Sequence, residues 1–357
     1  MNAAKALGMS SPPPSFLEGP SVWTGIQIQN DPHWIVCWTP EQIVELEKAA
    51  DYFLSTGTAL ENISEESFPL VALRPFIADI LDDLLAGRGF ILLRGLPVSQ
   101  WSIEKIAAVY MGLGRYMGTL RSSNGKGHLL GHVRDQGVNV EEGARFYQTN
   151  KKLDYHTDSA DIVGLLCLQK AKEGGESFIA SSMALYNELI ARRPDLISAM
   201  FTPYPTDRRG EVPDGLDPWF EIPIFSWFEG HLSCVYLRHY IEEAQRRFPK
   251  APRLSQEQIE VMDEIDLILQ NPEFALQMAF EPGDIQLLHN HQIMHSRNDF
   301  YNWPDPKLHR HLLRLWIAPE LGRPLPEYFA SRWGNVTPGD RGGIIVHGAK
   351  PSVELMF

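Results

Sequence analysis

The chain has 357 residues, of which 44% are hydrophobic and 22% are charged, the proportions of an ordinary globular protein with a large core. Its 45 acidic residues outnumber its 32 basic residues, and the formal net charge of −13 argues against nucleic acid or an anionic membrane as a partner. The three cysteines, Cys37, Cys167 and Cys234, form neither a disulfide framework nor a Cys-x-x-Cys zinc pattern. The sequence shows no signal-peptide pattern and no apolar run of membrane-spanning length, so a cytoplasmic location is expected.

The N-terminal section is predicted to be an arm followed by helices. Residues 1–20 are rich in proline and serine and are expected to form a flexible arm. Thr39 followed by proline predicts the start of a helix over 40–55. Apolar residues at helical spacing predict a second helix over 73–86, and the helical section is expected to end near residue 88.

Short strands are expected to dominate the next part of the chain, from about residue 89 to about residue 318. Apolar runs bounded by glycines or turns predict strands at 89–95, 162–168, 177–180 and 312–318. Capping residues and apolar spacing predict helices at 102–113, 181–192, 241–248 and 255–270. The turn at 281–284 is expected to start a strand that carries the distal histidines.

These elements predict a mainly β fold with flanking helices. Because the strands do not alternate with helices in βαβ units, we expect a double-stranded β-helix, or jelly roll, with N-terminal and inserted helices. Residues 21–357 are expected to form a single domain. Within it, an insertion at 202–270 would lie over the barrel mouth, with its helices on the outside, and a Gly/Pro-rich tail at 319–357 would fold over the site.

A His-x-Asp pair, His156 and Asp158, is the first candidate for chemistry. On a strand, residues i and i+2 face the same side, so both side chains can point at one ion. Two neutral imidazoles and one carboxylate leave the opposite face of Fe(II) open for other ligands. His295 is placed to supply the third ligand from a distant strand. An isolated pair in a chain with 12 histidines would be better explained as a surface or hydrogen-bonded histidine beside an acid.

Four features follow one another in a distinctive order. They are His156-x-Asp158, then Gly174-Gly175-Glu176-Ser177, then Pro282-Gly283-Asp284 with Asn290 and His295, then Arg310-His311-Leu312-Leu313-Arg314. In this order they resemble the taurine/2,4-D dioxygenase family of Fe(II)- and 2-oxoglutarate-dependent oxygenases. The resemblance runs from about residue 87 to about residue 318.

The resemblance implies an iron site. His156, Asp158 and His295 match the family's iron ligands. In the family the third ligand follows an asparagine after four intervening residues, which favours His295 after Asn290. His289 and His291 stay open as alternatives for that position because they share the strand parity of His295.

The resemblance also implies a co-substrate site. Arg310 matches the arginine that grips the distal carboxylate of 2-oxoglutarate, a task suited to a planar guanidinium. Ser177 stands where the family commonly has a threonine and keeps the hydroxyl. Arg314 shares the strand face of Arg310 and is expected to contact either the substrate's acid group or the co-substrate. Tyr147 and His132 are candidates for the substrate pocket, with ordinary packing as the alternative.

The function implied is oxidation of an unactivated C–H bond with Fe(II), 2-oxoglutarate and O2, giving succinate and CO2. The partner would be a small substrate that bears an acid group, as a carboxylate, a sulfonate or an amino acid. Two alternatives stay open: a zinc-dependent hydrolase with the same ligands, which would have no use for Arg310, and a non-catalytic jelly-roll binding protein. The sequence leaves a homo-oligomer open.

Overall fold

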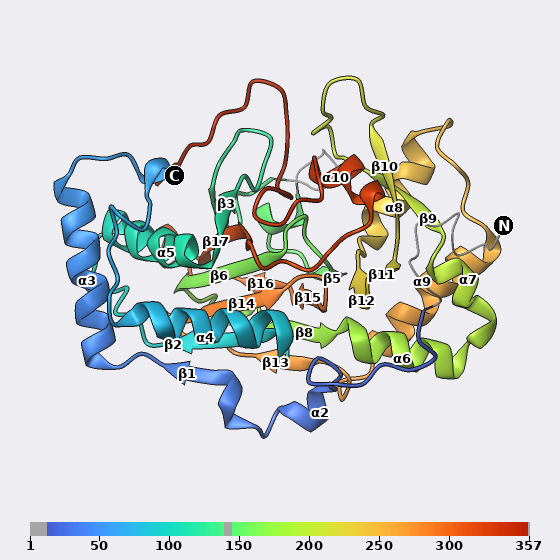
Figure 1. Cartoon of the computed structure of the whole chain (residues 1–357), viewed down its shortest axis with the longest axis horizontal. Coiled ribbons are helices and arrows are strands. Elements are labelled where there is room, and N and C mark those ends of the chain that lie inside the picture. Colours follow the sequence, from blue (N-terminus) through green and yellow to red (C-terminus); the bar gives the residue numbers. More distant parts are fainter. Residues whose placement is uncertain (1–12, 139–144, 356–357) are drawn as a thin grey trace.

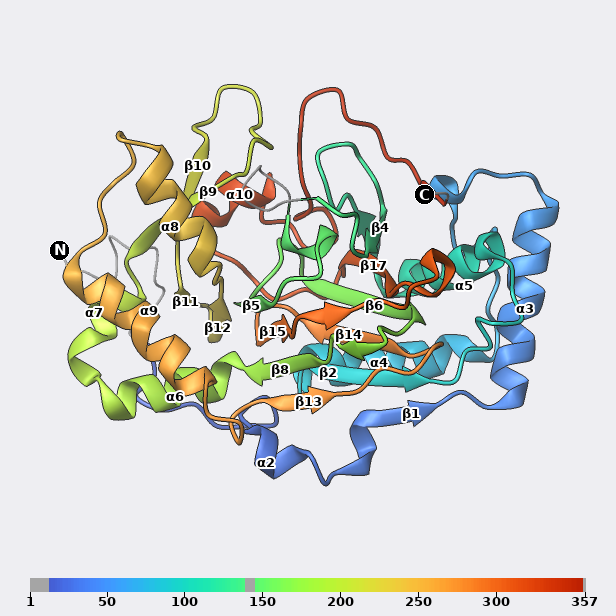
Figure 2. The same ribbon diagram turned by 180° about the vertical axis from the view of Figure 1, so that it is seen from behind.

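A computed structural model describes residues 13–138 and 145–355 of the chain. Two β-sheets lie in the middle of the molecule, with helices gathered toward both ends (Figures 1 and 2). The fold is mixed α/β, and the expectation of a sheet core with flanking helices is confirmed in this coarse form.

The N-terminal section is helical, as predicted. Its longer helices are α3 (Pro40–Ser55), α4 (Leu73–Ala86) and α5 (Ile103–Met117), and a single turn, α2 (Gly25–Ile28), precedes them. Thr39 caps α3, because its hydroxyl accepts a hydrogen bond from the Gln42 N–H and the Gln42 side chain accepts one from the Thr39 N–H. Ser102 caps α5 in the same position. These two helices therefore begin where a local side chain caps the first turn.

The larger sheet has the strand order β1-β2-β14-β6-β17-β3, and β4 also pairs with β17. Its strands are β1 (Ile35–Cys37), β2 (Phe90–Arg94), β14 (Ile285–His289), β6 (Ile162–Gln169), β17 (His311–Ala318), β3 (Thr119–Arg121) and β4 (Leu130–Val133). On β17, Leu313, Leu315 and Ile317 belong to the core formed with α3–α5. Because strand side chains alternate, Arg314 and Trp316 face the other side, where the candidate site lies.

The smaller sheet has the order β13-β8-β15-β5. Its strands are β13 (Leu276–Met278), β8 (Ser177–Ser181), β15 (Ile293–Arg297) and β5 (Leu153–His156). The chain crosses from the larger to the smaller sheet at residues 290–292, between β14 and β15. The prediction of one strand carrying the distal histidines is therefore wrong, because this turn breaks their common parity.

The predicted insertion contains two hairpins and two helices. They are β9 (Pro203–Asp207), β10 (Trp219–Pro223), β11 (Phe225–Phe228), β12 (His231–Cys234), α8 (Arg238–Arg247) and α9 (Gln256–Leu269). Before it lie α6 (Ser182–Arg192) and α7 (Ile197–Met200), and the tail holds α10 (Ala330–Trp333). A small pair, β7 (Glu173–Gly174) with β16 (Phe300–Tyr301), flanks the sheets.

Part of the predicted N-terminal arm is held against α6. The first twelve residues of the arm lie outside the described part, but the Tyr186 hydroxyl donates to the Pro14 carbonyl at 2.7 Å. The Asn187 side chain bonds both the N–H and the carbonyl of Leu17, each at 2.8 Å. Within residues 13–138 and 145–355, no helix is long and apolar enough to cross a membrane.

Candidate metal centre and cavity

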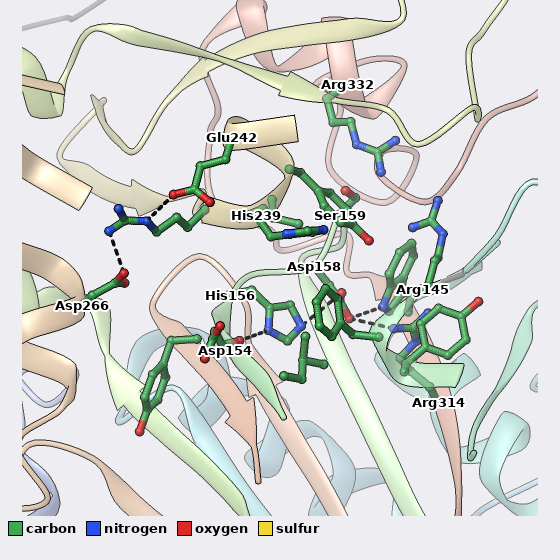
Figure 3. A pocket seen from close by; sticks show the side chains of 18 residues that line it. Arg145, Asp154, His156, Asp158, Ser159, His239, Glu242, Asp266, Arg314 and Arg332 are labelled. Atoms are coloured by element: carbon green, nitrogen blue, oxygen red, sulfur yellow. Dashed lines mark hydrogen bonds and ion pairs between the residues drawn. The ribbon is translucent and has the colours of Figure 1, made fainter. Parts of the chain in front are cut away.

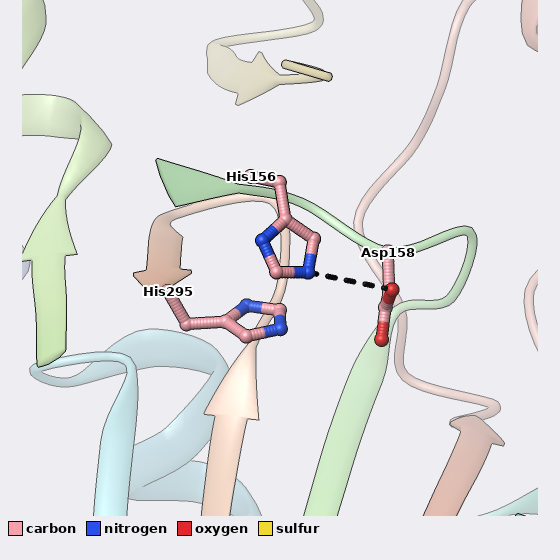
Figure 4. A group of neighbouring side chains, drawn as sticks. All are labelled: His156, Asp158 and His295. Carbon is pink, nitrogen blue, oxygen red and sulfur yellow. Dashed lines mark ion pairs between the residues drawn. The ribbon is translucent and has the colours of Figure 1, made fainter. Parts of the chain in front are cut away.

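His156, Asp158 and His295 lie together where the two sheets meet (Figure 4). One potential ligand atom of each lies within 4.8 Å of those of the other two. His156 stands opposite His295 in the β5–β15 register, so the strand pairing itself brings the two imidazoles to a centroid distance of 4.2 Å. His156 Nε2 lies 3.9 Å from Asp158 Oδ1.

The chemistry of this set fits a divalent metal ion. Burial lowers the pKa of His295 to about 3 and also lowers the pKa of His156, so both rings are neutral, the form that binds metals. The buried Nδ1 of His295 has no hydrogen-bond partner among the described residues. Two neutral imidazoles with one carboxylate form the set typical of non-haem iron sites with open positions.

The second oxygen of Asp158 is held by protein donors. The Trp316 indole N–H donates to Asp158 Oδ2 at 2.9 Å, and Arg314 Nη1 lies 3.4 Å from the same oxygen. Burial alone would raise the pKa of Asp158, but the positive charge of Arg314, the two imidazoles and the Trp316 hydrogen bond together outweigh it, and the pKa falls to about 2. The carboxylate is therefore ionised at neutral pH, with Oδ1 on the side of His156.

Asn290 ties the two distant ligand segments together. It lies in the turn between β14 and β15, and its amide oxygen accepts the Asp158 N–H at 2.9 Å. Its amide nitrogen donates to the carbonyls of Asp158 and Ala160, both at 2.7 Å. These three bonds fix the backbone around Asp158 relative to β15.

His289 and His291 point to the C-terminal tail instead of the cluster. His291 Nε2 bonds Asp161 Oδ1 at 2.9 Å, and its ring stacks on Trp333 at a centroid distance of 4.9 Å. His289 Nδ1 lies 3.3 Å from a guanidinium nitrogen of Arg323. Of the three distal histidines, the structure brings His295 to the cluster.

Arg310 is buried beside a separate cavity. Its Nη2 lies 3.4 Å from the Gly175 carbonyl, its guanidinium covers the Phe300 ring at 5.1 Å, and its Nη1 has no hydrogen-bond partner among the described residues. Burial lowers the pKa of Arg310 to about 10, so the group still carries a charge at neutral pH. A buried cation without an anion is costly, so Arg310 is suited to bind an anionic group.

Ser177 is also buried, on β8. Its hydroxyl lies 3.4 Å from the amide nitrogen of Gln286. The cavity beside Arg310 has a volume of about 290 Å³, and its lining includes Cys167, Gly175 and Leu312 but none of the three candidate ligands.

A second cavity, of about 280 Å³, opens next to the cluster (Figure 3). It is lined by Arg145, Phe146, Tyr147, Leu153, Asp154, Tyr155, His156, Asp158, Ser159, Leu237, Arg238, His239, Tyr240, Glu242, Asp266, Arg314, Trp316 and Arg332. We call it the metal-side cavity. Tyr147, a sequence candidate for the substrate pocket, is in this lining, and its ring lies 4.7 Å from the Arg314 guanidinium.

His132 lies elsewhere. It is buried on β4, with its Nδ1 2.8 Å from His311 Nε2 and its Nε2 2.8 Å from the Glu354 carbonyl oxygen. It is not among the residues that line the metal-side cavity, so this geometry gives no support to the prediction that it contacts substrate.

Charges in the metal-side cavity are separated to two sides, as Figure 3 shows. On one side, Arg238 bonds Glu242 at 2.8 Å and Asp263 and Asp266 at 2.7 Å each, so carboxylates outnumber the cation. Arginines dominate the other side. They are Arg145, Arg314 and Arg332.

Several lining residues were not predicted from the sequence. The start of α8 lies on the cavity, whereas its helix was expected on the outside of the fold. Arg145 and Arg332 carry no motif, and the fold alone brings them together. Trp316 could have been predicted to face the cavity, because it lies two residues after Arg314 on the same strand and therefore on the same face.

Comparison with known proteins identifies relatives over most of the chain. The model of the family described as "Taurine catabolism dioxygenase TauD, TfdA family" matches residues 55–316. FR-33289 synthase of Streptomyces rubellomurinus (strain ATCC 31215) is 33% identical over 326 residues, which cover 88% of this chain and 94% of that protein. Taurine hydroxylase-like protein SAT17 of Stachybotrys chartarum (strain CBS 109288 / IBT 7711) is 30% identical over 308 residues, covering 82% and 77%.

Solved structures share the fold at low sequence identity. Asparagine oxygenase in complex with Fe(II), 2S,3S-3-hydroxyasparagine and succinate superposes with a TM-score of 0.62 at 17% identity, covering 80% of this chain and 93% of that one. The non-haem iron oxygenase OrfP in complex with Fe and alpha-ketoglutaric acid gives a TM-score of 0.60 at 13% identity, covering 79% and 93%.

Proposed function

The chain belongs to the TauD/TfdA family of Fe(II)- and 2-oxoglutarate-dependent dioxygenases, and we propose that it oxidises an unactivated C–H bond of a small, acid-bearing substrate. Succinate and CO2 would be the co-products. The observation that carries this proposal is the cluster of His156, Asp158 and His295 at the wall of an open cavity.

In this proposal the cluster holds Fe(II), and the ion, with 2-oxoglutarate and O2, supplies the oxidising power for the C–H bond. Trp316 and Arg314 keep Asp158 ionised and fixed, with one of its oxygens free for the metal. The neutral ring of His295 offers a nitrogen that no described group occupies.

Arg310 and Ser177 bind the distal carboxylate of 2-oxoglutarate in this proposal. The support is chemical: Arg310 is a buried guanidinium whose Nη1 has no partner among the described residues, and a carboxylate would satisfy it. Ser177 lies buried on β8, two residues from the Gly175 carbonyl that Arg310 contacts, and offers a hydroxyl.

The cavity favours an amino acid or a similar compound within the acid-bearing class. Its arginine side suits an anionic group, and its carboxylate side, which includes Asp154, Glu242 and Asp266, suits an ammonium or another donor. Two of the neighbouring structures hold hydroxylated amino acids, 3-hydroxyasparagine and (3S)-hydroxy-L-Arg. We assign Arg314 to orienting Asp158, since it is bonded to that carboxylate and lies 4.7 Å from the rings of both Tyr147 and Trp316.

We also propose how the two sheets are related. The two sheets would be the halves of a double-stranded β-helix within one domain of residues 21–357. The antiparallel pairing of β14, β6 and β17 and the crossing between the sheets at residues 290–292 support it.

Conversion of 2-oxoglutarate to succinate tests the activity without knowledge of the substrate. We expect slow, Fe(II)-dependent succinate formation by the protein alone, and acceleration by one or more amino acids or other small acids. His156→Ala should abolish it, whereas His33→Ala, at an exposed histidine, should not. Folded, iron-loaded protein that never forms succinate would contradict the proposal, and hydrolysis supported by Zn(II) would favour the hydrolase alternative.

A further inference from the structure

Arg332 is a cation of the metal-side cavity for which the described residues supply no ion-pair partner. It lies on α10, borders the cavity, and holds its guanidinium over the Phe220 ring at 5.4 Å. Its buried Nε has no hydrogen-bond partner, and the side chain forms no ion pair with any residue in the described ranges. Burial lowers the pKa of Arg332 to about 10, which leaves it protonated at neutral pH.

Further positive charge surrounds Arg332. Arg145 lies on the same side of the cavity, as Figure 3 shows, and Arg208 covers the same Phe220 ring at 5.4 Å. One nearby carboxylate, Glu211, is bonded to Arg145. Arg208 bonds the backbone carbonyls of its own hairpin and of Ser331, which bring no charge. Among the described residues, the Glu211 carboxylate therefore pairs with Arg145 and not with Arg332.

The other arginines of the cavity each contact a carboxylate. Arg238 has three carboxylate partners, and Arg314 is bonded to Asp158 and lies against two aromatic rings. Among the described residues, Arg332 is thus the lining arginine without an anionic partner, and it stands beside Arg145, whose partner is Glu211. Such charge is costly in a partly buried place unless a ligand brings an anion.

We propose that Arg332 and Arg145 form the subsite that binds the anionic group of the substrate. The ligand class is an oxyanion, as a carboxylate, a sulfonate or a phosphate-type group, because a guanidinium presents paired N–H donors to two oxygens. The subsite deepens the proposed function and rests on it: it would hold one end of the substrate while another part lies beside the metal cluster. Arg314, in contrast, contacts Asp158 and is not part of this subsite.

We expect Arg332 to contribute to substrate specificity because of its position in the chain. Arg332 lies beyond residues 55–316, the part that the family model matches, whereas the candidate iron ligands lie inside it. Arg145 lies inside the matched part, so the subsite would combine one arginine of the tail with one of the shared core.

Anion titration of the protein loaded with Fe(II) and saturating 2-oxoglutarate, without O2, tests the subsite. Inorganic phosphate, sulfate and acetate are the probes, followed by calorimetry, and the visible metal-to-ligand charge-transfer band reports the iron site in the same sample. Saturation with 2-oxoglutarate keeps the probes away from Arg310. The probe that binds most tightly indicates the class of substrate acid.

We expect Arg332→Gln to raise the Kd of the preferred anion by roughly ten- to hundredfold, the range for loss of charge-assisted hydrogen bonds. The absorption band and the 2-oxoglutarate affinity should not change. Arg332→Lys keeps the charge and should show an intermediate Kd. Arg74→Gln removes an exposed arginine far from the cavity and is the matched control.

The outcomes separate the two proposals. Anion binding by Arg332→Gln as tight as by the wild type, or no anion binding by the wild type, would overturn the subsite while a normal band upheld the iron site. No band in the wild type would reject the proposed function, and the Arg332-dependence of anion binding would still decide whether the subsite exists.

Discussion

Replacement of Arg341 by methionine should destabilise the protein strongly, because it would leave Asp161 buried without its main counter-charge. Both side chains are inaccessible, with exposed fractions of 0% and 1%. Arg341 Nη2 lies 2.6 Å from Asp161 Oδ1, and Arg341 Nε lies 3.0 Å from Oδ2. Arg341 also donates to the carbonyls of Val336 at 2.9 Å and Arg323 at 2.7 Å.

The size of the effect follows from this burial. Breaking a buried pair by removing one partner costs about 3–5 kcal/mol. An exposed pair contributes at most about 1 kcal/mol, so Arg74→Met, which removes the exposed partner of Glu65, is a suitable control. A second change, Asp161→Asn in the Arg341→Met background, should recover part of the loss because no charge is then left unpaired.

Denaturant unfolding, followed by tryptophan fluorescence and circular dichroism, measures these differences in free energy of unfolding. The iron site should weaken as well, since the Asn290 N–H donates to the Asp161 carbonyl at 2.9 Å and the Asn290 side chain holds Asp158. The loss of free energy of unfolding in Arg341→Met should exceed that in Arg74→Met. An equal or smaller loss would refute the inference that the contact of Arg341 with Asp161 stabilises the segment that carries Asp158.

Three further outcomes are expected. Trp316→Phe should weaken Fe(II) binding roughly tenfold or more, because Asp158 loses a 2.9 Å hydrogen bond. Trp303→Phe, at an exposed tryptophan, should leave Fe(II) affinity unchanged, and equal affinities of the two variants would contradict this role of Trp316. Arg310→Gln should raise the KM for 2-oxoglutarate far more than that for the substrate, and the reverse order would assign Arg310 to the substrate. In the folded protein only Cys37 should react with a thiol reagent at neutral pH, because burial raises the pKa of Cys167 and Cys234 to about 12. Labelling of a second thiol would contradict this prediction.

Features with local causes were predictable from the sequence. The start of α3 at Thr39-Pro40 and the caps at Ser102 and Ser255 follow from donors near in sequence, and the structure has these helices within a few residues of the expected bounds. The His-x-Asp pair was expected on one strand, but β5 ends at His156 and Asp158 lies in the loop before β6, so strand alternation does not place both side chains.

Features that depend on distant contacts were not predictable. His289, His291 and His295 looked equivalent under one strand parity, and the turn that separates β14 from β15 made them different. Nothing local marks Arg332 as a cavity residue, because its place is set by how the tail packs back through buried contacts such as that of Arg341 with Asp161. Pairings of this kind are set by the whole fold.

An anaerobic absorption titration with Fe(II) and then 2-oxoglutarate tests the central claim most directly. The wild type and His291→Ala should develop a visible metal-to-ligand charge-transfer band, and His295→Ala should not, with circular dichroism to show that each variant is folded. Wild-type protein that is folded and binds iron but develops no band with 2-oxoglutarate would contradict the account.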